Sequence, residues 1–104
     1  MPRPLKSGET GARSELLVCA NLIKRGYEVF RAVSPHCSCD LLVLKSGITE
    51  RIEVRTGYKL PSGKVMYPNR AFDRSRSDVT AVITQEDDVI WYFDTKTRSL
   101  LAMN

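Results

Sequence analysis

Two carboxylates, Asp40 and Glu53, are the residues whose type and spacing most strongly suggest chemistry. Asp40 begins the apolar run 40–45 (DLLVLK), and Glu53 lies in the alternating run 50–57 (ERIEVRTG). The Ser-Gly pair at 46–47 predicts a tight turn that joins the runs into an antiparallel hairpin, with Asp40 opposite a residue near Glu53. Neighbouring carboxylates repel each other unless a cation lies between them. Mg²⁺ prefers such sites, where water or phosphate oxygen fills the remaining positions.

Arg55 adds a positive charge beside the acids. The spacing Glu-x-Arg places Glu53 and Arg55 on one face of the strand, ~7 Å apart along it. A cation there can hold a phosphate or stabilise negative charge in a transition state. Together with a formal net charge of +4, the set indicates phosphodiester hydrolysis. An ordinary alternative stays open, in which Asp40 is a turn residue and the other two belong to the solvated face of a strand.

The stretch SPHCSCDLLV (34–43) also places His36, Cys37 and Cys39 beside Asp40. A zinc site needs four ligands with room to surround the ion, and three ligands this close together cannot do so comfortably. Strand alternation puts Cys39 on the face opposite Asp40, where we expect it to be a small apolar filler. A zinc or thiol protein centred on this stretch is kept as an alternative.

A helix is expected to precede the strands that carry these residues. Four apolar residues fall at helical spacing and predict a buried stripe on a helix over 12–25: Leu16, Cys19, Ala20 and Ile23, with Leu17 and Leu22 widening it. Gly26 is expected to end that helix.

The rest of the chain reads as strands around one sheet. The run 79–84 (VTAVIT) is almost wholly apolar, which predicts a strand buried on both faces. Further strands are expected at 27–33, 40–45, 50–57, 89–94 and 99–103, with a loop at 58–69 and a short helix at 70–78. This order predicts an α/β fold with a central mixed sheet. Residues 1–10 are expected to form a flexible N-terminal arm and residues 11–104 a single domain.

Length and composition limit the classes of protein. A chain of 104 residues suits one compact domain, and no apolar run approaches the ~20 residues of a membrane helix. The start is basic and polar with no apolar stretch behind it, so we expect no secretory signal. Three cysteines, two of them one residue apart, argue against a disulfide framework. We therefore expect a cytoplasmic protein in a reducing compartment, with no membrane partner.

The ordered run GARSELLVCANLIKRGYEVFRAVSPHCSCDLLV, followed by ITERIEVRTG, resembles the PD-(D/E)xK nuclease superfamily, in particular its small Holliday-junction-resolvase-like branch. The shared features are a glycine and a glutamate that open the first helix, a glycine passage from helix to strand, an aspartate at the head of the second strand and E-x-K on the third. The match runs from about Gly8 to Gly57. It implies a restriction-endonuclease-like core with helices flanking the sheet.

The resemblance also implies roles for individual residues. Asp40 and Glu53 are the implied metal ligands, with the carbonyl of Val54 as a third and Glu15 reaching the metal from the helix. The implied cofactor is Mg²⁺, with Mn²⁺ as a substitute and no small-molecule cofactor. The implied activity is a metal-dependent endonuclease that cuts branched or structured DNA as a homodimer.

The chain departs from the family pattern at two positions. Cys39 stands where the family has proline, and Arg55 stands where it has lysine. Arginine keeps the charge but cannot give up its proton. Lys59 has the right strand parity to replace the lysine, but six extended residues span ~20 Å unless Gly57 folds the strand back. The alternative to an active nuclease is therefore a DNA-binding domain with weakened or lost catalysis.

Further basic residues suit a DNA backbone. Arg70 and Arg74 share one face of the expected short helix, and Lys59 and Lys64 lie on the proline-rich loop. Contacts of this kind give affinity without reading sequence. A merely solvated basic face is the alternative for these residues. For the whole chain, the short length also allows an interaction module, for example a phage-encoded protein that acts on a host nuclease, although nothing in the sequence requires it.

Overall fold

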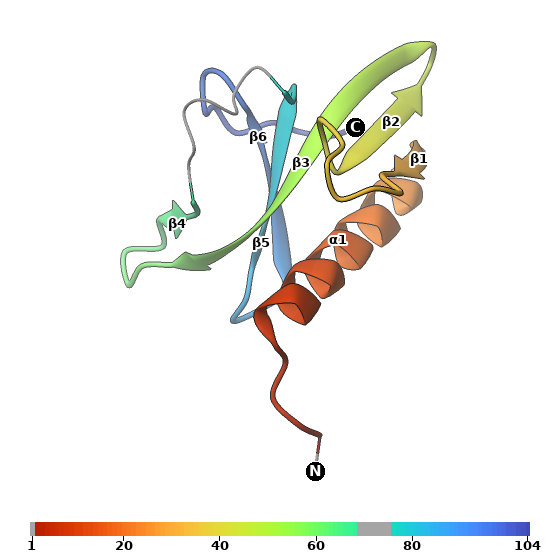
Figure 1. Ribbon diagram of the computed structural model, residues 1–104. Coiled ribbons are helices and arrows are strands. Elements are labelled where there is room, and N and C mark those ends of the chain that lie inside the picture. The colour runs from red at the N-terminus through yellow and green to blue at the C-terminus, as the bar shows by residue number, and fades with distance from the viewer. Residues whose placement is uncertain (1, 69–75) are drawn as a thin grey trace.

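The computed structural model describes residues 2–68 and 76–104, which form one α/β domain around a mixed sheet (Figure 1). The elements are α1 (Ser7–Lys24), β1 (Glu28–Arg31), β2 (Leu41–Lys45), β3 (Ile48–Lys59), β4 (Val65–Met66), β5 (Val79–Thr84) and β6 (Val89–Asp94). The sheet order is β1-β2-β3-β5-β6, with β4 paired to β3. β3 and β5 run parallel and the other pairs antiparallel. The expected fold class is confirmed.

The helix α1 begins at Ser7, so residues 7–10 of the expected arm are helical. Glu9 explains the early start, because its carboxylate accepts the Lys6 N–H at 3.1 Å and so satisfies a backbone donor at the helix N-terminus. The C-terminal end of α1 is as predicted, since Gly26 follows the last turn of the helix. Gly26 has φ +92°, and the Tyr27 N–H bonds back to the helix in the left-handed cap that glycine favours.

The buried face of α1 agrees with the predicted stripe only in part. Cys19 and Leu22 are buried as predicted, whereas Leu16 and Ile23 are 54% and 61% exposed. Ser14 and Val18 complete the buried face instead. Apolar content alone misplaced this face because a small polar residue lies on it. The Ser14 hydroxyl reaches the sheet through a hydrogen bond to a β3 threonine, described below.

The hairpin of β2 and β3 forms as predicted. Ser46 and Gly47 have φ of +52° and +78°, and Lys45 pairs with Ile48 across them. A two-residue loop with both φ positive matches the right-handed twist of the strands. This turn sets the register of the two strands, in which Leu41 at the start of β2 pairs with Ile52 of β3.

β5 is the buried centre of the sheet. All six of its residues are buried, between parallel β3 and antiparallel β6. Its apolar sequence follows from this position, because side chains on both faces are covered. The core towards α1 is formed by Val18, Leu22, Leu41, Val43, Ile52, Val79, Ala81 and Tyr92, among others.

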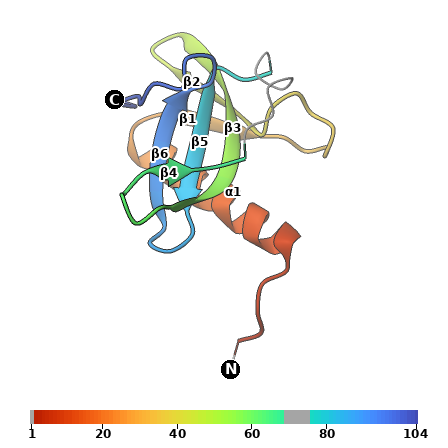
Figure 2. The same ribbon diagram turned by 90° about the vertical axis from the view of Figure 1, so that its left-hand side faces the viewer.

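The segment after Gly57 differs most from expectation. β3 continues to Lys59 and pairs with β4 in a short hairpin, where the sequence predicted only a loop over 58–69. Figures 1 and 2 show β4 on the side of the sheet away from α1. The expected last strand at 99–103 is wrong, since only a single bridge joins Phe93 to Leu100.

The expected short helix at 70–78 lies mostly outside the described residues. Its last three positions, 76–78, are described and are not helical. In the described part of the chain, no helix is both long and apolar enough to cross a membrane.

Candidate active site

Asp40 lies where β2 and β3 part. Leu41 and Ile52 form the last pair of the hairpin. Immediately beyond it, the Asp40 N–H donates to the Ile52 carbonyl at 3.2 Å, and the Val54 N–H donates to Oδ2 of Asp40 at 2.8 Å. The aspartate side chain therefore takes the place of a strand partner for the free edge of β3. This contact fixes one carboxylate against the backbone of β3.

Glu53 is the next residue of β3, and its side chain shares a face with Arg55. Ile52 and Val54 pack toward the core under α1, so alternation directs Glu53 and Arg55 to the opposite face. The Arg55 guanidinium forms an ion pair with the Glu53 carboxylate and donates to the Val54 carbonyl at 3.2 Å. Both side chains are largely covered, 22% exposed for Arg55 and 18% for Glu53.

Glu15 approaches from α1. It pairs with Arg31 of β1 at 3.1 Å and lines a surface cavity of about 290 Å³ together with Asp40. The structure therefore brings Glu15 to Asp40, and it brings Asp40 to the strand that carries Glu53. The sequence did not predict a role for Arg31, because its separation from Glu15 along the chain gives no sign that the two side chains meet.

Ser14 is a second residue that sequence reasoning missed. Its hydroxyl lies 2.7 Å from the Thr56 hydroxyl, one residue from Glu15 on the helix side and one from Arg55 on the strand side. The bond fixes the distance between α1 and β3 beside the acids. A small polar residue at helical spacing from Val18 and Leu22 was the available signal.

The donor set suits a hard divalent cation. The carboxylates of Asp40 and Glu53 and the carbonyl of Val54 are all oxygen ligands at the parting of two strands, and Mg²⁺ binds through one or two carboxylates plus water. Each of these candidate ligand oxygens already has a partner in the protein, and Arg55 bonds two of them, the Glu53 carboxylate and the Val54 carbonyl. A cation at this position would therefore compete with the guanidinium of Arg55.

The described residues contain no group of three or more His, Cys, Asp or Glu side chains placed to hold one metal ion. Glu15 pairs with Arg31, Asp40 accepts from Val54 and Glu53 pairs with Arg55. His36, Cys37 and Cys39 form no such group either, so the described residues give the zinc alternative no support. Burial raises the pKa of the Cys39 thiol, as suits an apolar filler and not a thiolate ligand.

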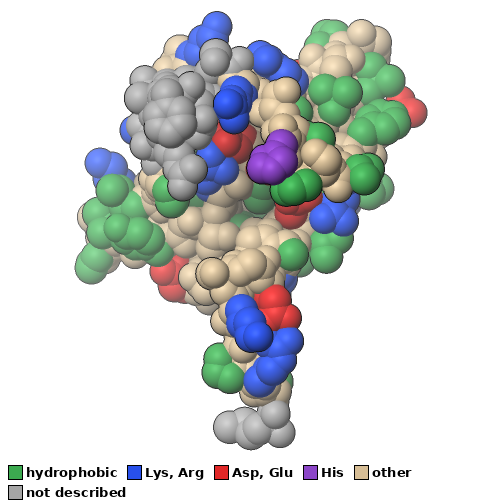
Figure 3. Space-filling model, in the orientation of Figure 1, with side chains coloured by type: hydrophobic (Ala, Val, Ile, Leu, Met, Phe, Trp, Pro, Cys, Tyr) green, Lys and Arg blue, Asp and Glu red, His purple; other side chains and the backbone are tan. Residues whose placement is uncertain are grey.

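Only two of the four predicted DNA-contacting residues, Lys59 and Lys64, lie among the residues that the structure describes. Lys59 pairs with Asp87 at 2.8 Å and lies over the ring of Trp91, so it does not replace the family lysine beside Glu53. Lys64 lines a cavity beside β4. Arg70 and Arg74 lie outside the described residues. Figure 3 shows acidic and basic side chains on both sides of the single histidine, on the face that carries the 32–40 loop.

A family model described as PD-(D/E)XK endonuclease matches residues 5–103. The chain belongs to this family. Its members generally use divalent metal ions, and their fold implies DNA as the substrate. The match covers the hairpin, the acids and the strands that follow them, so the superfamily suggested by the sequence is confirmed.

Two individual proteins are similar to this family member. Protein 5.3 of Escherichia phage T7 is 29% identical, over 82% of this chain and 79% of that protein. The bacterial homing endonuclease I-Ssp6803I has a similar structure, with a TM-score of 0.74 over 89% of this chain and 68% of that one. At 20% identity, this second likeness concerns the fold.

Proposed function

We propose that this protein is a divalent-metal-dependent endonuclease that hydrolyses phosphodiester bonds in branched or otherwise structured DNA. The observation that carries the proposal is the bond from the Val54 N–H to Asp40, which holds one acid next to the strand that carries Glu53. In the proposal, Asp40, Glu53 and the Val54 carbonyl hold Mg²⁺ or Mn²⁺, and Glu15 contributes from α1. When bound, such an ion polarises a phosphoryl oxygen and lowers the pKa of its water.

The remaining residues of the site bind and orient the DNA in this proposal. Arg55 stabilises charge on the phosphate, because a guanidinium stays protonated and cannot act as a base. Lys59, Lys64, Arg70 and Arg74 contact the DNA backbone. A homodimer supplies two sites, as symmetric cutting of two strands requires. An intracellular setting is part of the proposal, because Cys19, Cys37 and Cys39 are all free thiols.

The second candidate is a DNA-binding domain of the same family with weakened or lost catalysis. One contact favours it: the Arg55 guanidinium bonds both the Glu53 carboxylate and the Val54 carbonyl, which are two of the proposed metal ligands. A guanidinium that stays there would exclude the metal while leaving a basic surface for DNA.

The two candidates separate in one assay. Linear, flapped and four-way-junction DNA of equal length are incubated with the protein in Mg²⁺, in Mn²⁺ and in a chelator, and cleavage and binding are both measured. The endonuclease proposal predicts metal-dependent cleavage of branched substrates that Asp40→Asn abolishes while binding is retained. Binding of all substrates without cleavage, in either metal, would select the second candidate. Equal cleavage of linear DNA would remove the branched-substrate part of the proposal.

The homodimer has its own test. Light scattering on a sizing column gives the mass of the particle, for which one chain is 11.7 kDa. A mass near two chains, with and without a four-way junction, is expected. A single chain under both conditions would contradict the dimer and leave the cleavage proposal standing.

A further inference from the structure

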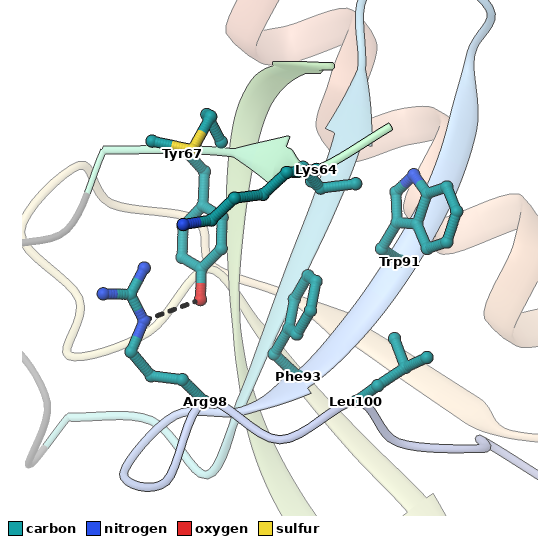
Figure 4. Close-up of a pocket in the computed structure, with 8 residues that line it drawn as sticks. Lys64, Tyr67, Trp91, Phe93, Arg98 and Leu100 are labelled. Carbon is teal, nitrogen blue, oxygen red and sulfur yellow. Dashed lines mark hydrogen bonds between the residues drawn. The ribbon is translucent and has the colours of Figure 1, made fainter. Parts of the chain in front are cut away.

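A second cavity lies on the face of the sheet away from α1. It has a volume of about 510 Å³, within the range of small-molecule sites. One wall is the β4 hairpin, and the other is the outer face of β6 with the segment that follows it. Figure 4 shows its main side chains, which are Lys64, Tyr67, Trp91, Phe93, Arg98 and Leu100.

Three aromatic rings give the cavity flat apolar walls. The rings of Tyr67 and Phe93 are stacked, with centroids 5.3 Å apart and planes 26° apart. The Arg98 guanidinium lies over the ring of Tyr67, 4.9 Å from its centroid. Trp91 lies two residues before Phe93 in β6, so the two side chains share one face of the strand. Such walls favour a flat aromatic group, which stacks on rings and on guanidinium planes.

The charges around the cavity favour an anion attached to that flat group. Lys64 and Arg98 are both lining residues, and none of the lining residues that the structure describes is acidic. An apolar peptide side chain would need no cations, and a free phosphate would need no rings. Aromatic platforms beside basic side chains are the arrangement that binds single-stranded nucleic acid.

The cavity is aligned with the candidate active site. Glu53 pairs with Thr80, which pairs with Phe93, so Glu53 and Phe93 stand in one row across three strands and on one face. In the neighbouring row Arg55 pairs with Val82, which pairs with Trp91. Two strand spacings amount to about 10 Å. One DNA strand can therefore contact Glu53 and the cavity together.

We propose that this cavity binds one unpaired nucleobase of the DNA, stacked on Trp91 and Phe93, with Lys64 and Arg98 contacting the adjacent phosphates. The inference rests on the proposed function for the identity of the polymer. It deepens that function, because unpaired bases occur in flaps, single-stranded tails and opened branch points and are absent from an intact duplex. A base pocket beside Glu53 would direct cleavage to such positions.

Trp91 gives a direct measurement, since it is the single tryptophan of the chain. The full protein is titrated in a chelator, which prevents cleavage, with a short single-stranded oligonucleotide and with an abasic strand of equal length. Stacking of a base should quench the Trp91 fluorescence, and the abasic strand should bind through charge alone with little quenching. Equal quenching by both strands would overturn the proposal. So would binding of both, seen by anisotropy, without any quenching.

Variants separate stacking from charge. Phe93→Leu keeps an apolar side chain and removes a ring, so it should weaken binding of the base-containing strand about tenfold and leave the abasic strand unchanged. Lys64→Gln should weaken both strands alike. Lys24→Gln, at the far end of α1, removes the same charge away from the cavity and is the matched control. Equal effects of Lys64→Gln and Lys24→Gln would contradict a phosphate contact at the cavity.

Other occupants and the proposed function are distinguished in the same set. A Trp91 signal that changes with protein concentration before DNA is added would assign the cavity to a second copy of the chain and overturn the proposal. Metal-dependent cleavage of branched DNA without base-dependent quenching would overturn only the pocket. Base-dependent quenching without cleavage in any metal would sustain the pocket and remove the endonuclease activity.

Discussion

The backbone N–H of Val54 donates to Oδ2 of Asp40 across 2.8 Å, at the point where β2 leaves β3. The contact has two effects. It satisfies a backbone donor on an edge of β3 that has lost its partner strand, and it holds a carboxylate beside the backbone of the residue that follows Glu53. Structure and proposed chemistry therefore depend on the same side chain, and substitutions can separate them.

Asp40→Asn and Asp40→Ala should differ in stability and agree in activity. Asparagine can still accept the Val54 N–H through its side-chain oxygen, so its free energy of unfolding should fall by less than about 1 kcal/mol. Alanine removes the acceptor, and loss of a hydrogen bond to a charged group costs about 1.5–3 kcal/mol. Both should abolish metal-dependent cleavage. Urea unfolding and the junction assay measure the two effects; an asparagine variant that cuts at the normal rate would contradict the metal role of Asp40.

Arg55→Lys should raise metal-dependent cleavage. Lysine is a point charge without the planar fork that lets Arg55 bond the Glu53 carboxylate and the Val54 carbonyl together. Once these two oxygens are free of the guanidinium, Mn²⁺ should bind roughly three- to tenfold more tightly, which corresponds to the loss of a competing ion pair of about 1 kcal/mol. Calorimetric titration with Mn²⁺ and the cleavage rate are the measurements.

Arg55→Gln is the control for that substitution. It also releases Glu53 but carries no charge for a phosphate, so it should tighten metal binding and still lower cleavage. If both variants bind Mn²⁺ as weakly as the native protein, the Arg55 contacts do not compete with the metal.

Local signals in the sequence predicted much of this fold. The turn at 46–47, the buried strand at 79–84 and the glycine at the end of α1 are set by neighbours along the chain, and all were predicted correctly. The position of Asp40 beside Glu53 and Val54, in the middle of β3, followed from counting residues on either side of that turn. Short-range chemistry thus places the proposed ligands on adjacent strands.

Contacts between distant segments could not be predicted in this way. Arg31 meets Glu15, and Ser14 meets Thr56, only after α1 has packed on the sheet. That packing selects a helix face with a small polar residue on it, where periodicity favoured Leu16. The bonds of Arg55 to its own neighbours depend on the choice of rotamer, for which the sequence contains no signal.

The β5–β6 turn should make stability depend on pH. The Lys59 ammonium, followed by the Thr84 hydroxyl, lowers the pKa of Asp87 from 3.8 to about 2. A folded pKa below the unfolded value means that the carboxylate stabilises the fold above about pH 4 and that this contribution is lost as the pH falls to about 2. Asp87→Asn should therefore be less stable than the native protein at pH 7, and the difference should shrink as the pH falls toward 2.

Urea midpoints at pH 7, 4 and 2.5 measure this effect. Glu86→Gln is the matched control, because it removes a carboxylate from the same turn that forms no ion pair with the described residues. Because it breaks no ion pair of the described residues, it should cost less stability at pH 7 than Asp87→Asn. A difference for Asp87→Asn that is as large at pH 2.5 as at pH 7 would contradict the role of the Lys59 pair.

Gly57→Ala should disrupt the β4 hairpin. A Cβ at Gly57 would overlap the carbonyl oxygen of Met66 and lie 2.8 Å from Cγ1 of Val82, and both are held by strand pairing. Relief requires β4 to move away from β3, so the free energy of unfolding should fall by about 1–3 kcal/mol. The same movement would displace the wall that Met66 and Tyr67 give to the aromatic cavity, and the Trp91 emission should shift.

Gly11→Ala provides the comparison for that variant. Gly11 lies in α1, where an added Cβ meets nothing within 4 Å, and alanine in a helix interior is favoured over glycine by about 0.8–1 kcal/mol. This variant should therefore be more stable, with unchanged Trp91 emission. A Gly57→Ala protein with native stability and emission would mean that β4 can be displaced without effect on the cavity. In that case the close approach of β4 to β3 would not be what shapes the cavity wall.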